Sequence, residues 1–197
     1  MDDKRFVLGA AKGWLMLIRA HGQSDGFTLI EVLIAMAILG LTLAMAAPSI
    51  TTWIQNSQIR TASENIRTGL QKARAEAIRR NGNVEFKLDH PTDTGGTGWT
   101  ITSLIDGTVV EVAPSNEGTR NVKLTLTPDG ATTTTFNGFG RLLATAANPL
   151  VRIDVDSASL SASDSHKLRI VILDGSDIKM CDPDPTITDA KDPRACP

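Results

Sequence analysis

Aromatic residues are scarce in this sequence, and tyrosine is absent. The 197 residues have an aromatic content of only 4%. Surfaces that recognise sugars or stack nucleic-acid bases usually depend on aromatic rings, so neither kind of surface is expected. Histidine is also rare: His21, His90 and His166 are scattered along the chain and build no metal-binding motif.

Motifs of the common enzyme classes are missing as well. The chain has no GxSxG nucleophile motif, no phosphate-binding P-loop and no pair of zinc ligands on a helix. Asp164–His166 contains the residue types of a catalytic triad, but adjacent loop residues rarely meet in triad geometry. Gly95–Gly98 opens no helix, so it indicates a turn rather than a phosphate cradle. We therefore expect neither an enzyme nor a cofactor.

Charge is nearly balanced over the whole chain but unevenly distributed. The net charge is −2. Residues Pro48–Gly82 carry six Lys or Arg against two Glu, whereas Asn83–Pro197 carry ten Lys or Arg against sixteen acidic residues. A basic stem followed by an acidic head differs from the uniformly basic surface of a nucleic-acid-binding protein.

A long apolar run, Phe27–Ala47, stands out in the first quarter of the chain. It is 21 residues long, and at about 1.5 Å of rise per residue a helix of this length spans the roughly 30 Å hydrocarbon core of a bilayer. Residues 1–26 are interpreted as a leader that is removed during maturation, with Met16 as an alternative start to Met1. The basic residues of this leader predict a cytoplasmic N-terminus and a periplasmic head.

One acidic residue, Glu31, lies inside this apolar run. A carboxylate in the hydrocarbon core costs on the order of 2.5–3.5 kcal/mol on insertion scales, so a plain anchor would not carry one. We expect its partner to be a positive charge brought by another subunit.

Beyond Ala47 the pattern becomes that of an amphipathic helix. Apolar residues recur mainly at steps of three and four, which predicts one buried stripe. The stripe comprises Ile50, Trp53, Ile54, Ile59, Ala62, Ile66, Leu70, Ala73 and Ala77. Asn81-Gly82 is a suitable stop because both residues tolerate positive φ. Residues 27–82 therefore contain one helix that runs from about Phe27 to Arg80.

After Gly82 the apolar period changes to two, which is typical of half-buried strands. The predicted strands are Val84–Leu88, Trp99–Ile101, Thr108–Val112, Val122–Leu126, Thr132–Phe136, Val151–Val155 and Leu168–Ile172, with turn-rich segments between them. Together they predict an α+β fold in which the long N-terminal helix packs on a β-rich antiparallel head, residues 83–197.

The segment Gly26-Phe27-Thr28-Leu29-Ile30-Glu31, followed by an apolar helix, resembles the processing site of type IV pilins and type II secretion pseudopilins. An ordinary signal peptide is cut after its apolar core, whereas this site precedes the core. The resemblance implies that a prepilin peptidase cuts after Gly26 and methylates Phe27. It also implies that Glu31 attracts the N-terminal amine of a neighbouring subunit, so that two charges that are costly in lipid neutralise each other. The family's helix-softening glycine and proline have counterparts in Gly40 and Pro48.

The head carries a second resemblance. Phe136–Arg141 (FNGFGR), then the strand Lys167–Leu173 and a cysteine tail, is similar to the FimT/FimU/GspH group of minor pilins and pseudopilins, and the tail is most similar to the FimU and FimT types. This implies a single-pass inner-membrane protein that enters a type IV pilus through its N-terminal helix. There it would prime or cap assembly with other minor and major pilins, in twitching motility or adhesion.

Two cysteines, Cys181 and Cys196, lie in the tail with fourteen residues between them. We favour a disulfide because the periplasm is oxidising and the closed loop would contribute about 3 kcal/mol. The alternatives are two free thiols or half of a metal site, although no third and fourth ligand is apparent. A calcium site is not favoured, since the spacing of the tail aspartates fits no EF-hand loop. These aspartates are Asp174, Asp177, Asp182, Asp184, Asp189 and Asp192.

Three alternative functions are kept. The first is a GspH-type pseudopilin of a type II secretion system, and the second is an anchored periplasmic domain that never polymerises. The third is a FimT-like DNA-uptake receptor, which the GRxR motif of some relatives suggests. The nearest match to that motif is Gly175–Lys179, where Ser176 replaces the first arginine. DNA is therefore a partner that is not favoured.

Overall fold

The computed structural model describes residues 26–143, 148–173, 177–187, 189 and 191–197, and of Ala46 and Ala47 only the backbone. Residues 1–25 of the predicted leader, with both candidate starts, Met1 and Met16, thus lie outside the described residues. The chain divides into two compact units, Met1–Ala44 and Met45–Pro197. The second unit contains the head.

One long helix, α1 (Leu29–Arg80), contributes to both units. At its C-terminal end the backbone N–H of Gly82 donates to the Ala77 carbonyl, and that of Asn81 donates to the Ile78 carbonyl. Asn81 has the left-handed conformation, with φ of 49°. This pairing satisfies carbonyls that the helix leaves free, and it explains why the helix ends at the predicted stop.

Eight short strands follow the helix. They are β1 (Val84–Leu88), β2 (Trp99–Ser103), β3 (Val109–Ala113), β4 (Val122–Thr127), β5 (Thr133–Phe136), β6 (Arg152–Ser157), β7 (Leu168–Ile172) and β8 (Ile178–Cys181). The first seven confirm the sequence-based prediction. β8 was not predicted, because the adjacent apolar residues Met180 and Cys181 break the alternation that Ile178 begins.

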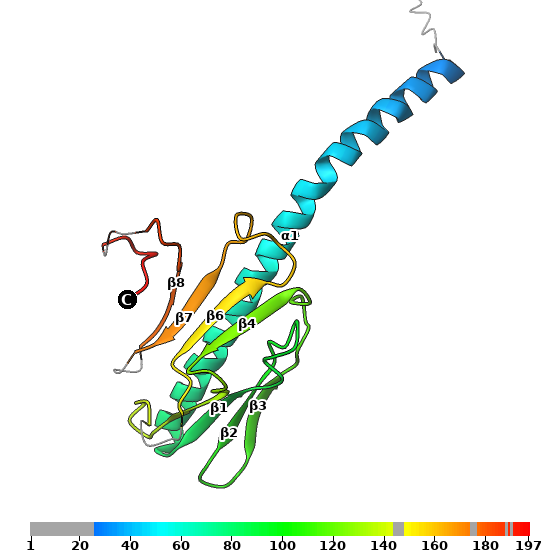
Figure 1. Ribbon diagram of the computed structural model, residues 1–197. Helices are drawn as coiled ribbons and strands as arrows, with labels where there is room; N and C mark the ends of the chain where they lie inside the picture. Colours follow the sequence, from blue (N-terminus) through cyan, green and yellow to red (C-terminus); the bar gives the residue numbers. More distant parts are fainter. Residues whose placement is uncertain (1–25, 144–147, 174–176, 188, 190) are drawn as a thin grey trace, which may run out of the picture. The chain divides into compact units, whose positions relative to one another are not determined.

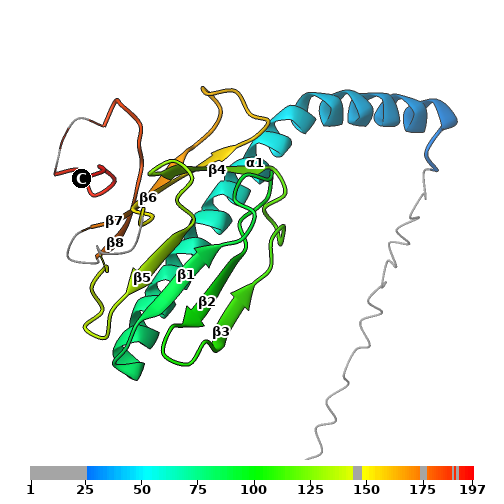
Figure 2. The ribbon, with the colours of Figure 1, turned by 60° about the horizontal axis from the view of Figure 1, so that its bottom comes forward.

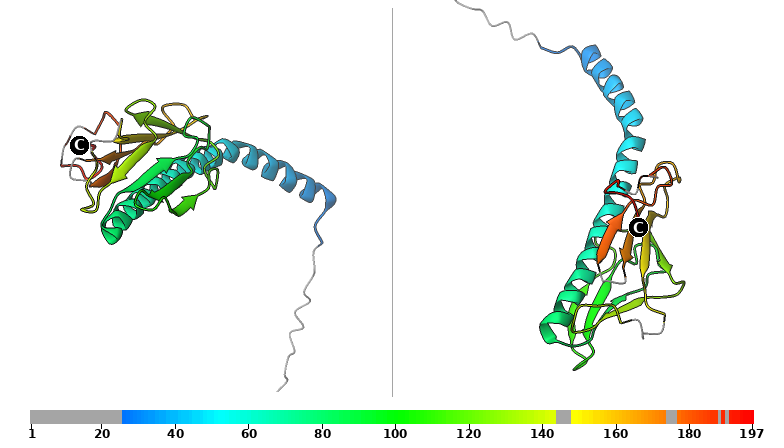
Figure 3. Two further views of the ribbon diagram at one scale, coloured as in Figure 1. Left: turned by 90° about the horizontal axis from the view of Figure 1, so that it is seen from below. Right: turned by 90° about the vertical axis from the view of Figure 1, so that its left-hand side faces the viewer.

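The strands form two antiparallel sheets with the orders β3-β2-β1-β5 and β4-β6-β7-β8 (Figures 1 and 2). The first sheet is closed by a long-range pairing in which Val84 of β1 lies opposite Phe136 of β5. The part of α1 in the second unit lies along one face of both sheets (Figure 3). The predicted α+β class, a long helix on an antiparallel head, is confirmed.

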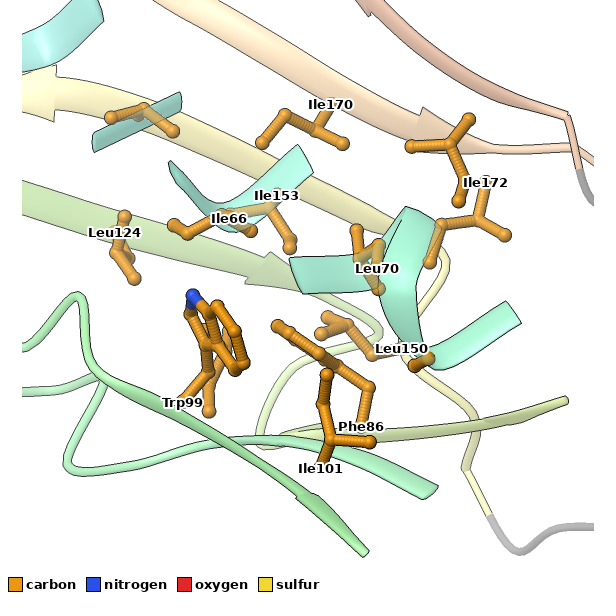
Figure 4. Close-up of a cluster of buried hydrophobic side chains, with 14 of the residues drawn as sticks. Ile66, Leu70, Phe86, Trp99, Ile101, Leu124, Leu150, Ile153, Ile170 and Ile172 are labelled. Carbon is orange, nitrogen blue, oxygen red and sulfur yellow. The ribbon is translucent and has the colours of Figure 1, made fainter. Parts of the chain in front are cut away.

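The core lies between α1 and the inner faces of the two sheets (Figure 4). In this view Ile66 and Leu70 of α1 lie above the side chains of Phe86 and Trp99 and next to Ile153. All five are at most 2% exposed. Burial of such side chains contributes about 1.5–3 kcal/mol each, which fixes the helix on the head.

The predicted helix stripe is buried only in its second part. From Ile59 onward its members are 0% exposed. Ile50, Trp53 and Ile54 have exposed fractions of 53%, 71% and 43%, so the prediction that they belong to the buried stripe is wrong. In this stretch polar side chains contact the head instead: Gln55 accepts from Ser157 and Ser159, Asn56 bonds to Asp164 and His166, and Gln58 accepts from Asn121.

The first unit holds an apolar helix whose large side chains are exposed. From Phe27 to Leu43 each large apolar side chain has an exposed fraction of at least 43%. Among the described residues, no single helix meets a length and hydropathy test for crossing a membrane. The segments Leu29–Met45 and Pro48–Arg80 meet it only together, as a broken pair.

A carboxylate in the last turns of α1 makes the stability of the head sensitive to acid. Hydrogen bonds from Arg79 and Arg80 lower the pKa of Glu76 from 4.5 to about 2. A group whose folded-state pKa is depressed contributes stability above its unfolded pKa and loses it as the pH falls toward the folded value. Because Arg79 is 66% exposed, we expect this contribution to stay below about 1 kcal/mol.

Glu76→Gln should therefore destabilise the protein near neutral pH, and the difference from wild type should shrink as the pH falls from 4.5 toward 2. Urea unfolding of both proteins across this range, in detergent, measures the difference. A difference in the free energy of unfolding that stays constant with pH would contradict the assignment.

Candidate assembly site

The residues predicted to be processed lie just before α1. Gly26, Phe27 and Thr28 precede the first helical residue, and Phe27 is 81% exposed. The backbone N–H of Glu31 donates to the carbonyl oxygen of Thr28 at 3.1 Å and to its hydroxyl oxygen at 3.3 Å. Thr28 is therefore the N-cap, and the peptide bond after Gly26 lies in exposed, non-helical chain of the kind that a peptidase can reach.

Glu31 has a second candidate role, at the start of its own helix, besides its expected pairing with another subunit. It stands three residues after the N-cap, where Thr-x-x-Glu forms a capping box. A carboxylate in the first turn is also stabilised by the helix dipole. The sequence itself contains this Thr-x-x-Glu spacing, from Thr28 to Glu31, whereas the resemblance to pilins explains only the charge of Glu31.

Gly40 and Pro48 both lie inside α1. A Cβ atom at Gly40 would meet no other atom within 4 Å, so packing within the chain does not require a glycine there. The hydroxyls of Thr51 and Thr52 donate to the Pro48 carbonyl at 2.8 and 3.2 Å. That these two residues soften the helix stays a prediction.

The FNGFGR segment, Phe136–Arg141, forms a turn beside the C-terminal end of α1. Asn137 Oδ1 accepts two backbone N–H groups of the turn, both at 3.0 Å. Arg74 Nε of α1 donates to the Gly140 carbonyl at 3.1 Å. The turn is thus held by its own asparagine and by the helix.

Two glycines allow this turn to lie directly against the helix end. A Cβ atom at Gly138 would lie 2.7 Å from the backbone carbon of Asn81, and one at Gly140 would lie 2.6 Å from Cδ1 of Ile78. Gly140 also has φ of +71°. Between them, Phe139 is 84% exposed. A rigid turn therefore presents one aromatic ring to its surroundings.

Phe139 belongs to a group of exposed apolar side chains that we call the distal cluster: Ile78, Leu104, Ile105 and Phe139. Their exposed fractions are 51%, 50%, 59% and 84%. Ile105 lies against Gly82, where a Cβ atom would be 2.1 Å from its Cδ1, just as Ile78 lies against the FNGFGR turn. Gly138 also lies against Asn81 and Gly82, so both turns meet the same end of α1. Exposed apolar side chains that gather at one place mark interaction sites. Sequence reasoning missed this cluster because three of its members lie in turns, where no periodicity applies.

A disulfide joins Cys181 and Cys196, as predicted. Cys181 ends β8, the edge strand of the second sheet. Beyond it the backbone N–H of Asp182 donates to the Arg194 carbonyl at 2.8 Å. The disulfide thus holds the tail beside a sheet edge that would otherwise be open to pairing.

Replacing both cysteines, Cys181→Ser with Cys196→Ser, should lower the free energy of unfolding by about 3 kcal/mol, the loop-closure value for a loop of this length. Urea unfolding with and without dithiothreitol provides the control. Reductant should lower the stability of the wild type to that of the double variant and leave the variant unchanged. Equal stability of the oxidised wild type and the variant would refute the prediction.

The aspartates of the tail accept hydrogen bonds within the tail's own turns. Backbone and side-chain hydrogen bonds from Thr186 lower the pKa of Asp184, and those from Arg194 lower the pKa of Asp192. Within the described residues, no three His, Cys, Asp or Glu side chains converge as metal ligands. Asp174 lies outside the described part of the chain.

Asp164–His166 does not form a triad. Ser165 Oγ donates to Asp156 Oδ1 at 2.5 Å rather than to the imidazole, and the backbone N–H of His166 donates to Asn56 of α1 at 2.8 Å. Burial raises the pKa of Asp156, but the hydrogen bonds from Ser165, Lys167 and the Ser157 backbone, together with the charge of Lys167, lower it by more. Through its bond to Asn56 this segment holds its loop against α1.

A cavity of about 750 Å³ lies beside the outer face of the second sheet, between that sheet and the tail. Its charged lining is largely paired: Arg169 lies 2.5 Å from Asp154, and Lys167 lies 3.2 Å from Asp156. Side chains that already neutralise each other offer little to a charged ligand.

The basic stem is also engaged within the chain. Its ion pairs include Arg60–Glu64 at 3.0 Å, Lys72–Glu111 at 2.5 Å, Arg79–Glu76 and Arg80–Glu76 both at 2.5 Å, and Arg80–Asp106 at 3.3 Å. Cations held in this way release fewer counterions from phosphate. In the weak GRxR match, Gly175 and Ser176 lie outside the described residues.

Two family models match the chain. The model described as type II transport protein GspH matches residues 62–176, more than half of the chain. The model described as the prokaryotic N-terminal methylation motif matches residues 23–47, which include Gly26, Phe27 and Glu31.

Two crystal structures of the type IV minor pilin FimU of Pseudomonas aeruginosa PAO1 are similar at 17% identity. The structure in space group P65 has a TM-score of 0.46 and the match covers 61% of this chain and 90% of that chain. The structure in space group P21 has a TM-score of 0.47 and the match covers 65% and 91%. No curated protein matches the sequence significantly. On the family models, the chain belongs to the GspH family of type IV minor pilins and pseudopilins.

Proposed function

We propose that this chain is a minor pilin of a type IV pilus. The observation that carries the proposal is the methylation motif at residues 23–47, together with the exposed apolar helix that it opens. A prepilin peptidase cuts after Gly26 and methylates Phe27. The apolar helix then serves first as a membrane anchor and afterwards as the part that enters the filament.

In this proposal the precursor crosses the inner membrane once, with its head in the periplasm. A run of large exposed apolar side chains is unfavourable in water, so the helix needs either lipid or neighbouring helices around it. Transfer from the bilayer into a filament core keeps those side chains out of water throughout. Glu31 is the exception, and the N-terminal amine of a neighbouring subunit compensates its charge.

The head contacts other pilins through the distal cluster and thereby primes or caps assembly. An exposed aromatic ring on a rigid turn loses little conformational entropy on binding, which is typical of interface hot spots. The role is structural, in twitching motility or adhesion. The ion-paired stem does not favour the DNA-receptor alternative.

Phe139→Ala should reduce the number of surface pili without lowering the stability of the head, because the ring is 84% exposed. Hot-spot truncation typically costs about 2 kcal/mol or more, so an effect of at least about tenfold is expected. Val112→Ala, at an exposed position of β3 outside the cluster, is the matched control. Pili in wild-type numbers with Phe139→Ala would remove the distal cluster from the proposal.

The second candidate is a pseudopilin of a type II secretion system, which the description of the matching family model favours. We favour the pilus because the cysteine tail resembles FimU and FimT types. Deletion and complementation, with surface pili and secreted proteins scored side by side, separates the two. Loss of secretion with normal pili would replace the pilus assignment with the pseudopilin one.

A further inference from the structure

The face of α1 that points away from the head stays apolar beyond the predicted membrane span. Ile50, Trp53 and Ile54 are three and four residues apart and so share one face of the helix. They are 53%, 71% and 43% exposed, whereas Gln55 and Ile59 face the head. Trp53 is the most exposed of the three.

This apolar face ends abruptly one turn later. Ser57 and Arg60 follow Trp53 on the same face at steps of four and seven, and Arg60 pairs with the exposed Glu64 at 3.0 Å. The change from apolar to charged side chains therefore falls directly after Ile54. Such a change marks the boundary between an apolar surrounding and water.

Three threonine hydroxyls in this part of α1 are already satisfied within the helix. Thr51 and Thr52 donate to the Pro48 carbonyl, and Thr42 donates to the Leu39 carbonyl at 2.9 Å. In lipid a polar side chain is tolerated when its donor is bonded internally. These bonds therefore allow the helix to be immersed as far as Thr51.

We propose that the bilayer-buried part of the helix is Val32–Thr51 and that Trp53 lies at the periplasmic lipid headgroups. About 20 helical residues span the hydrocarbon core, and counted back from Thr51 they begin at Val32, directly after Glu31. No ionisable residue lies in this range. Trp53 is two residues, about 3 Å, beyond it. Tryptophan is enriched at this level because its ring is apolar and its N–H is polar.

This register, which depends on the proposed membrane anchor, changes the position of Glu31. The carboxylate and the processed N-terminus at Phe27 both lie at the cytoplasmic boundary while the protein is stored. Glu31 then meets water or headgroups in the membrane and loses them only on transfer into the filament. Pairing with a neighbouring amine is required at that step rather than during storage.

Tryptophan quenching by brominated phospholipids tests the register. The full chain with Trp14→Phe is reconstituted into phosphatidylcholine vesicles that carry bromine either near the headgroups or near the bilayer centre. Trp99 is 2% exposed and contributes a constant emission, which is measured in the double variant Trp14→Phe/Trp53→Phe. In this double variant, Ile50→Trp or Ser57→Trp adds one tryptophan about one helical turn before or after position 53. Both positions are exposed, so the head should fold unchanged.

We expect Trp53 and Ile50→Trp both to be quenched more by headgroup bromine than by central bromine, with more central quenching at Ile50→Trp than at Trp53, and Ser57→Trp to be quenched by neither. Absence of quenching at Trp53, with quenching of Ile50→Trp by headgroup bromine alone, overturns the register in favour of a span that ends near Ala47. If the emission of these tryptophans changes with the protein-to-lipid ratio but not with bromine, this face binds a second copy of the chain. That result also overturns the register. Failure of the wild type to float with vesicles instead refutes the membrane anchor in the proposed function.

Discussion

Glu31→Gln is expected to reduce incorporation into filaments by at least about two orders of magnitude and to leave membrane insertion unchanged. Removal of one partner from a buried ion pair costs about 3–5 kcal/mol, and each 1.4 kcal/mol is about tenfold in an equilibrium. Inside a filament the N-terminal amine of the neighbouring subunit would remain buried without its counter-charge. The measurement is the ratio of the variant in sheared filaments to that in carbonate-washed membranes, by immunoblot.

Glutamine is the informative replacement because Glu31 has two candidate roles. Its backbone N–H bonds to Thr28, and its position is that of a capping box, where glutamine serves as well as glutamate. Glu31→Gln therefore removes the charge and preserves the helix start. Thr28→Ala is the matched control, since it removes the cap, at a cost of about 1 kcal/mol, and preserves the charge.

The two variants together decide between the roles. Charge pairing predicts a large loss with Glu31→Gln and less than about a tenfold loss with Thr28→Ala. If Glu31→Gln enters filaments at wild-type levels, the carboxylate has no intersubunit role. A loss with Thr28→Ala alone would then assign Glu31 to the start of its own helix.

The helix and most strands were predictable because each has a local cause. Apolar residues at steps of three and four mark the buried face from Ile59 to Ala77, and alternation marks strands such as Val84–Leu88. The stop at Asn81 follows from its tolerance of positive φ. These features depend on a few neighbouring residues, so one sequence suffices to identify them.

Other features depend on contacts that are distant in sequence. Periodicity places Trp53 on the helix stripe, but the loops that bond Gln55 and Asn56 decide which face meets the head. The division into two sheets follows from the pairing of β1 with β5, across three intervening strands. The distal cluster combines a helix end with two turns, for which no periodic signal exists.

Gly69→Ala is expected to lower the free energy of unfolding by about 1–3 kcal/mol, as overpacking of a core does. On an exposed helix the same change would stabilise by about 1 kcal/mol. Gly69 faces the first sheet, where a Cβ atom would lie 2.6 Å from Cε2 of Trp99 and 2.8 Å from Cε2 of Phe86. The two ring centroids are 5.7 Å apart, and Trp99 Nε1 donates to Asn65 Oδ1 at 3.2 Å. Neither ring can move aside without disturbing another buried group.

Two comparisons identify the rings as the cause. Thr68→Ala, on the exposed face one residue away, should change the stability by less than about 0.5 kcal/mol in urea unfolding of the full chain in detergent. In a Trp99→Leu background the closest clash disappears while that with Phe86 at 2.8 Å remains, so Gly69→Ala should cost less than in the wild type. An undiminished cost there would mean that Phe86 or the helix backbone, and not Trp99, requires glycine. The expected coupling would instead show that Gly69 is present so that α1 can approach the first sheet closely enough to bury Trp99.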